Sequence, residues 1–212
     1  CVRERNAEMI VTKTEACTRT KYRVWLDGEF AFVLYKGELS RYGIREGEEI
    51  AGSTVEKIEQ EVVLKRAKLY AMHLLEDMDR TESGLREKLR RAMYPEKAVE
   101  GAVEYVRSFG YLDDGRFAEN FVRSRKNLKS RKEIRALLTQ KGVDSEKIDA
   151  AFEICYGEED EQAAAAALLR KKRFDPDTAD ETEIRKICGY LARKGFRYET
   201  VRQVIQNYSE DA

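Results

Sequence analysis

An apolar pattern that recurs three times after residue 64 constrains the fold of this 212-residue chain more than any other feature. In the first helix of each copy, an apolar triplet repeats every 47 residues, as Ala71, Leu74, Leu75, then Ala118, Phe121, Val122, then Ala165, Leu168, Leu169. In the next two helices, a second set recurs after 49 and then 53 residues, as Leu85, Leu89, Val99, Val103, then Ile134, Leu138, Ile148, Phe152, then Ile187, Leu191, Val201, Ile205. The added residues therefore lie in the loop between the first and second helices. Because one such unit cannot bury its own apolar face, the pattern predicts an elongated tandem array of three-helix repeats.

The first 54 residues have a different pattern, which favours strands. Asp27-Gly28 separates two runs of alternating apolar residues within 22–35, and this arrangement is the sequence signature of a β-hairpin. Three glycines between residues 37 and 47 indicate a turn-rich segment. Since an isolated hairpin is only marginally stable, we expect the sheet to include residues 9–14 and to lean on the helices.

The chain is therefore predicted to be mainly α-helical, with a small N-terminal β module. The predicted parts are the β module at 1–54 and three-helix repeats at 55–109, 110–157 and 158–212. Helices are expected at 55–78, 82–92, 96–108, 115–127, 131–141, 145–155, 160–172, 183–194 and 198–208.

The ends of several helices carry recognisable signals. Thr81 and Ser130 precede apolar helical stripes and are expected to be N-caps. Gly142 and Gly195 follow the second helix of repeats two and three, where a left-handed residue ends a helix. Repeat one has Met93 there instead, followed by Tyr94-Pro95, so its turn is expected to survive in another form.

Charge is segregated along the chain although 40 basic and 40 acidic residues balance overall. Residues 27–61 carry a local charge of −5, whereas residues 123–135 carry +6. A predicted basic stripe for DNA or filament binding consists of Arg123, Lys126, Lys129, Arg131, Lys132 and Arg135 in repeat two, Arg86, Arg90 and Arg91 in repeat one, and Arg170, Lys171, Lys172 and Arg173 in repeat three. Two readings stay open, a solvated charged face or contact with the phosphates of a nucleic acid.

Adjacent Asp113 and Asp114 invite a catalytic or metal-binding interpretation, but one of them is expected to cap the helix that begins near Gly115. Arg125 is expected to pack its stem beside Phe121 and to pair with one of these carboxylates. One histidine, four cysteines without ligand spacing and no phosphate-binding loop favour a protein that is not an enzyme and holds no metal or cofactor. With no apolar run of membrane-span length and no signal-peptide pattern, a cytoplasmic protein is expected.

Several segments resemble the RecX family of bacterial recombination regulators. The similarity is strongest at residues 110–125, GYLDDGRFAENFVRSR, and extends to residues 71–91 and 134–152. The N-terminal hairpin and LSRYGIREGEEI resemble the front end of some members. Met93 and Gly115 depart from the usual residues of the family.

This resemblance implies a curved array that binds RecA filaments and inhibits the recombinase, ATPase and coprotease activities of RecA in DNA repair, recombination and the SOS response. It implies that the protein occupies the filament groove. A monomer is expected, and the residues themselves favour structural roles for Asp113, Asp114 and Arg125. An alternative hypothesis is a helical-repeat DNA-binding protein that acts without a recombinase partner.

Overall fold

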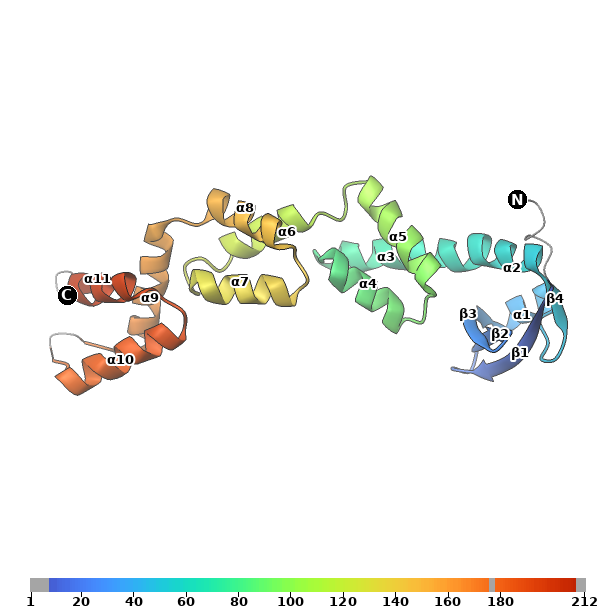
Figure 1. Ribbon diagram of the computed structural model, residues 1–212, viewed down its shortest axis with the longest axis horizontal. Coiled ribbons are helices and arrows are strands. Elements are labelled where there is room, and N and C mark those ends of the chain that lie inside the picture. Colours follow the sequence, from blue (N-terminus) through green and yellow to red (C-terminus); the bar gives the residue numbers. More distant parts are fainter. Residues whose placement is uncertain (1–7, 176–177, 209–212) are drawn as a thin grey trace. The chain divides into compact units, whose positions relative to one another are not determined.

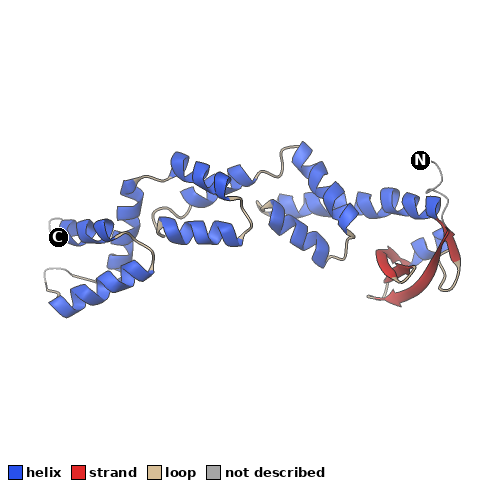
Figure 2. Ribbon diagram, viewed as in Figure 1, coloured by secondary structure: helices blue, strands red, loops and turns tan. Residues whose placement is uncertain are grey.

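The computed structural model describes residues 8–175 and 178–208, which are mainly helical with a small antiparallel sheet near the N-terminus (Figures 1 and 2). The chain divides into two compact units, residues 1–112 and residues 113–212. The first unit contains the sheet and the first repeat, and the second contains repeats two and three. This confirms the predicted class of three-helix repeats with an N-terminal β module.

The sheet has four strands in the order β3-β2-β1-β4, in which the strands are β1 (Glu8–Ala16), β2 (Lys21–Leu26), β3 (Glu29–Tyr35) and β4 (Glu49–Ala51). Asp27 and Gly28 both have positive φ, 49° and 87°, as a tight turn between twisted strands requires. The predicted hairpin is confirmed, and so is its pairing with residues 9–14. The short strand β4 was not predicted.

A β-bulge interrupts the alternation that the sequence predicts in the hairpin. The register between β2 and β3 shifts between Val24 and Trp25, so that Trp25 lies opposite Phe30. Phe32 is fully buried, whereas Phe30 is 40% exposed although it has the same parity along the strand. Bulges re-aim side chains in this way, so the alternation of apolar residues within 22–35 does not put both phenylalanines on one face of the sheet.

The segment predicted to be turn-rich contains a short helix, α1 (Lys36–Tyr42), which ends at Gly43 with φ 68°. Its Glu38 accepts a hydrogen bond from the backbone N–H of Tyr35 at 2.7 Å. Glu38 also accepts two hydrogen bonds from Arg66, at 2.6 and 2.8 Å, and Arg66 donates another to the carbonyl of Val33. Contacts with residues distant in sequence therefore fix a helix that its own seven residues do not predict.

The helix predicted at 55–78 is longer and less regular than expected. It runs through α2 (Gly52–Ile58), a π-helical segment η2 (Glu59–Leu64) and α3 (Lys65–Asp77). At the end of η2, Leu64 packs against Gly101, where a Cβ atom would lie 2.7 Å from the leucine Cδ1. The boundary predicted between residues 54 and 55 lies inside α2.

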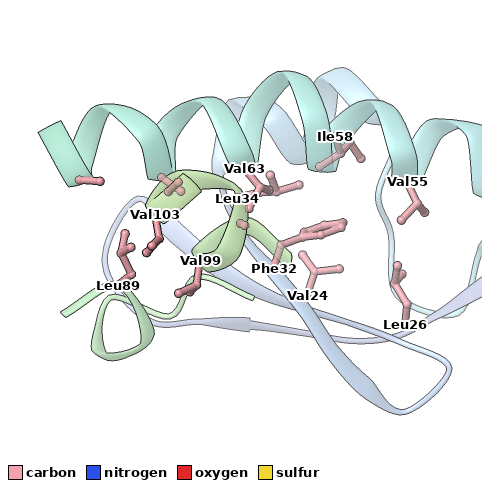
Figure 3. Packing of buried hydrophobic residues seen from close by; sticks show 14 of the residues in the cluster. Val24, Leu26, Phe32, Leu34, Val55, Ile58, Val63, Leu89, Val99 and Val103 are labelled. Atoms are coloured by element: carbon pink, nitrogen blue, oxygen red, sulfur yellow. The ribbon is translucent and has the colours of Figure 1, made fainter. Parts of the chain in front are cut away.

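One apolar core joins the sheet to the first repeat. Figure 3 shows Phe32 and Leu34 of β3 beneath Ile58 and Val63, and the same core continues into α4 (Glu82–Arg91) and α5 (Glu96–Ser108) through Leu89, Val99 and Val103. The prediction that the sheet leans on the helices is confirmed. The β module and repeat one bury their apolar faces against each other.

The second unit contains α6 (Asp114–Arg123), α7 (Arg131–Gln140), α8 (Ser145–Cys155), α9 (Glu158–Lys172), α10 (Glu181–Arg193) and α11 (Tyr198–Tyr208). Repeat two and repeat three each have a core cluster, and these contain the predicted apolar stripes. Helix α6 ends at Arg123, four residues before the predicted end, and turns follow it.

The three repeats share one turn geometry between their second and third helices. Met93, Gly142 and Gly195 all have left-handed backbone, with φ values of 63°, 77° and 90°. In each repeat the next backbone N–H bonds to the carbonyl five residues earlier, as the Schellman motif requires, in the pairs Tyr94–Leu89, Val143–Leu138 and Phe196–Leu191. The expectation of a different turn at Met93 was therefore wrong, because the methionine itself adopts the left-handed conformation.

Candidate binding surface

The basic residues of repeat one are held by carboxylates of the same repeat. Arg86 donates hydrogen bonds to Glu82 and to Glu100, and Arg91 donates one to Glu87. Arg90 donates two to Glu96, at 2.9 and 2.5 Å. These bonds from Arg90 are the main reason that the pKa of the Glu96 carboxyl lies below its usual value. The positive charge of this cluster is thus locally neutralised.

Most basic residues of repeat two are also partnered. Arg123 pairs with Glu119 at 2.9 Å, and further ion pairs join Lys129 to Glu133 and Arg135 to Asp149. The Arg131 guanidinium lies 4.8 Å from the centre of the Phe152 ring. Pairing with Arg135 is the main cause that lowers the pKa of Asp149. The +6 charge of residues 123–135 is therefore smaller at the surface than the sequence indicates.

A helix that extended to residue 127, as predicted, would place Lys126 on an exposed face, but Lys126 pairs with a carboxylate instead. Its ammonium lies 3.0 Å from a carboxylate oxygen of Asp160 on α9, and its side chain is 31% exposed. The difference follows from the early end of α6, because Lys126 lies in the turn after the helix rather than on an exposed helical face. The interaction joins repeat two to repeat three.

The basic residues of repeat three gather at the end of α9. Lys172 lies 4.9 Å from the centre of the Tyr190 ring, and Arg173 ends the helix with φ 53°. Within residues 8–175 and 178–208, four members of the predicted stripe have neither an ion pair with a carboxylate nor a cation–π contact with an aromatic ring: Lys132, Arg170, Lys171 and Arg173. All four are exposed.

Asp113 is the N-cap of α6, as predicted for one of the two aspartates. Its carboxylate accepts hydrogen bonds from the backbone N–H groups of Gly115 and Arg116, at 2.9 and 3.1 Å. Asp114 is the first helical residue and is 8% exposed. Arg125 packs over the Phe121 ring at 3.8 Å and bonds to Ser124, so its predicted position beside Phe121 is correct. In the described part of the chain, Arg125 contacts Phe121 and Ser124, and it does not form the predicted ion pair with Asp113 or Asp114.

Sequence reasoning missed two buried polar contacts, one that joins repeat two to repeat three and one within repeat three. Ser130 is fully buried, and it both caps α7 and donates to the carbonyl of Lys194 at 2.6 Å. Glu161, with a side chain only 4% exposed, accepts two hydrogen bonds from Arg197. Burial, followed by the nearby Glu161 carboxylate, raises the pKa of the Tyr156 hydroxyl. The cap at Ser130 was predictable from the sequence. The bonds from Ser130 to Lys194 and from Arg197 to Glu161 were not, because the partners lie 64 and 36 positions apart.

Metal sites and membrane-spanning helices are both absent from the part of the chain that the structure describes. Over residues 8–175 and 178–208, no three His, Cys, Asp or Glu side chains come close enough to hold a metal ion. In the same part of the chain, no helix is both long enough and apolar enough to cross a membrane.

Comparison with known proteins places all three repeats in one family. Models of the first, second and third three-helix domains of RecX match residues 67–105, 113–151 and 158–205. A protein named Regulatory protein RecX from Caldanaerobacter subterraneus subsp. tengcongensis is 30% identical, over 88% of this chain and 92% of its own length. One of the same name from Clostridium beijerinckii is 27% identical, over 92% and 94%. A crystal structure of regulatory protein RecX is 26% identical, with a TM-score of 0.64 and coverage of 92% and 98%. The chain belongs to the RecX family of regulatory proteins.

Proposed function

We propose that this protein binds the filament that the RecA recombinase forms on DNA and thereby inhibits its recombinase, ATPase and coprotease activities. Membership of a family of regulatory proteins, shown by three matched domains, is the observation that carries the proposal. The protein would act as a cytoplasmic monomer without catalysis of its own. The segments 55–109, 110–157 and 158–212 would be successive contact modules along the groove of the filament.

The mechanism would be steric and electrostatic. Three tandem repeats supply several separate contacts, and linked contacts gain affinity through a high effective concentration. A protein that occupies the groove would exclude the second DNA, the repressor substrate and the next RecA subunit. Of the stripe, the exposed cations with neither a carboxylate nor an aromatic partner (Lys132, Arg170, Lys171 and Arg173) would approach the DNA phosphates most readily.

The alternative is a DNA-binding protein that needs no recombinase, and ion pairing in the stripe argues against it. Each phosphate contact contributes about −0.9 to the slope of log K against log salt for duplex DNA. If all thirteen stripe residues contacted phosphates, the slope would be roughly −12. If only the four cations without a carboxylate or aromatic partner do, the slope would be roughly −4, which supports only weak binding to bare DNA. A titration of duplex DNA at several salt concentrations measures this slope directly.

The test of the proposed function measures ATP hydrolysis by RecA on single-stranded DNA as this protein is added. We expect hydrolysis to fall and filaments to shorten. The triple variant Lys132→Gln, Arg170→Gln, Lys171→Gln should inhibit less, because it removes unpaired positive charge without breaking an ion pair. A matched control, Lys36→Gln, Lys57→Gln, Lys65→Gln, removes the same charge elsewhere and should inhibit like the wild type. Unchanged hydrolysis at saturating wild-type protein would refute the proposal.

A further inference from the structure

The first unit contains an aromatic groove that shares only one residue, Arg90, with the predicted basic stripe. A hollow of about 530 Å³ lies between the sheet and the turn that joins α4 to α5. Trp25 and Phe30 contribute from the strands, while Met93, Tyr94 and Pro95 contribute from the turn. The β-bulge creates the strand side of this groove, because it places Phe30 opposite Trp25 with the rings edge to face at 6.0 Å.

The backbone at the groove is held in a costly conformation. Met93 has φ 63°, in the left-handed region where a residue with a Cβ atom costs roughly 1–2 kcal/mol. The equivalent turns of repeats two and three use Gly142 and Gly195, which avoid that cost. The methionine side chain lines the groove, and the Nε of Arg23 approaches its sulfur at 3.3 Å. A strained residue whose side chain faces a hollow points to a function for that side chain.

The charges of the groove favour an acidic occupant. Two arginines and one glutamate line it, and the glutamate, Glu96, already accepts both hydrogen bonds of Arg90. Arg23 is left with a weak partner, since its guanidinium lies 3.9 Å from Glu15. Glu15 is closer to Lys13, at 3.3 Å, so one carboxylate serves two cations. A carboxylate from another molecule would therefore complete the coordination of Arg23.

The same residues favour a protein over a nucleic acid. Bases bind by stacking on flat aromatic faces, but the Lys13 ammonium lies 4.9 Å from the Trp25 ring centre and covers a face. Tryptophan, tyrosine, methionine and arginine, the residue types gathered here, are enriched at the centres of protein–protein interfaces.

We propose that this groove docks an acidic segment of the recombinase, with one apolar side chain seated against Trp25, Met93 and Tyr94 and a carboxylate bound to Arg23. The proposal rests on the proposed function and adds a protein-to-protein contact in the first unit. The β module then contributes directly to recognition of the partner.

The test compares binding of the wild type and three variants to RecA filaments on single-stranded DNA, and to the same DNA without RecA. Arg23→Glu reverses the docking charge, and Met93→Gly removes the side chain while relieving its backbone. Each should weaken filament binding about thirtyfold, the loss at which an interface residue counts as a hot spot. Lys57→Glu, an equal charge change on an exposed residue of α2 outside the groove, should bind like the wild type.

The outcomes separate the two proposals. Failure of the wild type to bind filaments would overturn the proposed function together with the docking site. Wild-type affinity in both groove variants would overturn the docking site alone. An equal loss of affinity for bare DNA would also overturn it, since the groove would then be a nucleic-acid site. Loss confined to filaments, with an unchanged unfolding transition in Met93→Gly, is the expected result.

Discussion

The left-handed backbone at Met93 predicts that glycine is more stabilising than alanine at this position, which is the reverse of the preference inside a helix. Both substitutions remove the methionine side chain, so the comparison isolates the backbone. Alanine retains the strain of roughly 1–2 kcal/mol that a Cβ atom causes at positive φ. Glycine is free of it, but its more flexible unfolded chain costs about 0.5–1 kcal/mol. We expect Met93→Gly to exceed Met93→Ala in unfolding free energy by about 0.5–1 kcal/mol.

The chain provides its own probe for this measurement. Trp25 is the only tryptophan and lies in the same unit and the same groove as Met93. Urea unfolding followed by Trp25 fluorescence therefore reports on the first unit. With a slope of about 1–3 kcal/mol per molar urea, the expected difference is a few tenths molar in the midpoint.

A control in the same helix gives the opposite sign. Lys88 is exposed in α4, five residues before Met93, and has helical backbone. There Lys88→Gly should be about 1 kcal/mol less stable than Lys88→Ala, because glycine is a poor helix former. If alanine is the more stabilising residue at both positions, φ 63° at Met93 carries no strain and the reasoning is refuted.

Three further predictions concern the caps, the shared core and acid stability. Ser130→Ala should cost about 1–2 kcal/mol through the lost cap and buried hydrogen bond, seen in circular dichroism but not in Trp25 fluorescence. Phe32→Ala should cost about 3–5 kcal/mol and shift both signals together, whereas a shift in fluorescence alone would contradict a core shared by sheet and helices. Burial raises the pKa of Glu82, but hydrogen bonds from Arg107 and a second arginine outweigh it and hold the pKa below 4.5. Its stabilising contribution is complete above pH 4.5 and lost as the pH falls through the lower folded value, so Glu82→Gln should flatten the fall of urea midpoints in acid.

Long helices were predictable because their apolar stripes and end signals agree. The helices at 96–108 and 145–155 have the predicted bounds, and Thr81 and Ser130 cap as expected. In these segments the 3.6-residue period extends over three turns and each end has its own local signal. The repeat adds a second constraint, since the same stripe has to be buried three times.

Short and irregular elements were not predictable, because contacts outside the segment stabilise them. Helix α1 depends on the bonds from Arg66 to Glu38, which lies 28 residues away. Strand β4 pairs only three residues, and its partner strand is about 40 positions earlier. The π-helical segment and the β-bulge beside Trp25 each insert a residue into a helix or strand whose residue types are otherwise ordinary for that element. The periodicity of apolar residues within a segment cannot predict contacts with distant segments.

The candidate surface shows a similar limit, since charge counts do not reveal pairing. Arg123 finds its partner one helical turn away, which a helical projection predicts. Lys126 finds Asp160 on another helix only because α6 ends early. The aromatic groove escaped detection for the same reason, as its residues come from positions 23–30 and 90–96.

The shared turn of the repeats suggests where specialisation of the fold has occurred. The same hydrogen bonds close the turn in each repeat. The turn itself therefore does not explain why the left-handed residue differs between repeats, and the residues packed around that position do. At Gly195 the surroundings exclude a side chain, because a Cβ atom would lie 2.9 Å from the Cβ of Lys132 in repeat two. At Met93 the surroundings are the sheet and the groove, and a side chain is present despite its backbone cost. One position thus serves as a packing contact in repeat three and as part of a binding groove in repeat one. The basic stretch lies in repeat two, but the strained backbone, at Met93, lies in repeat one. A strained conformation persists only where another interaction offsets its cost, and at Met93 that interaction is the proposed binding in the groove.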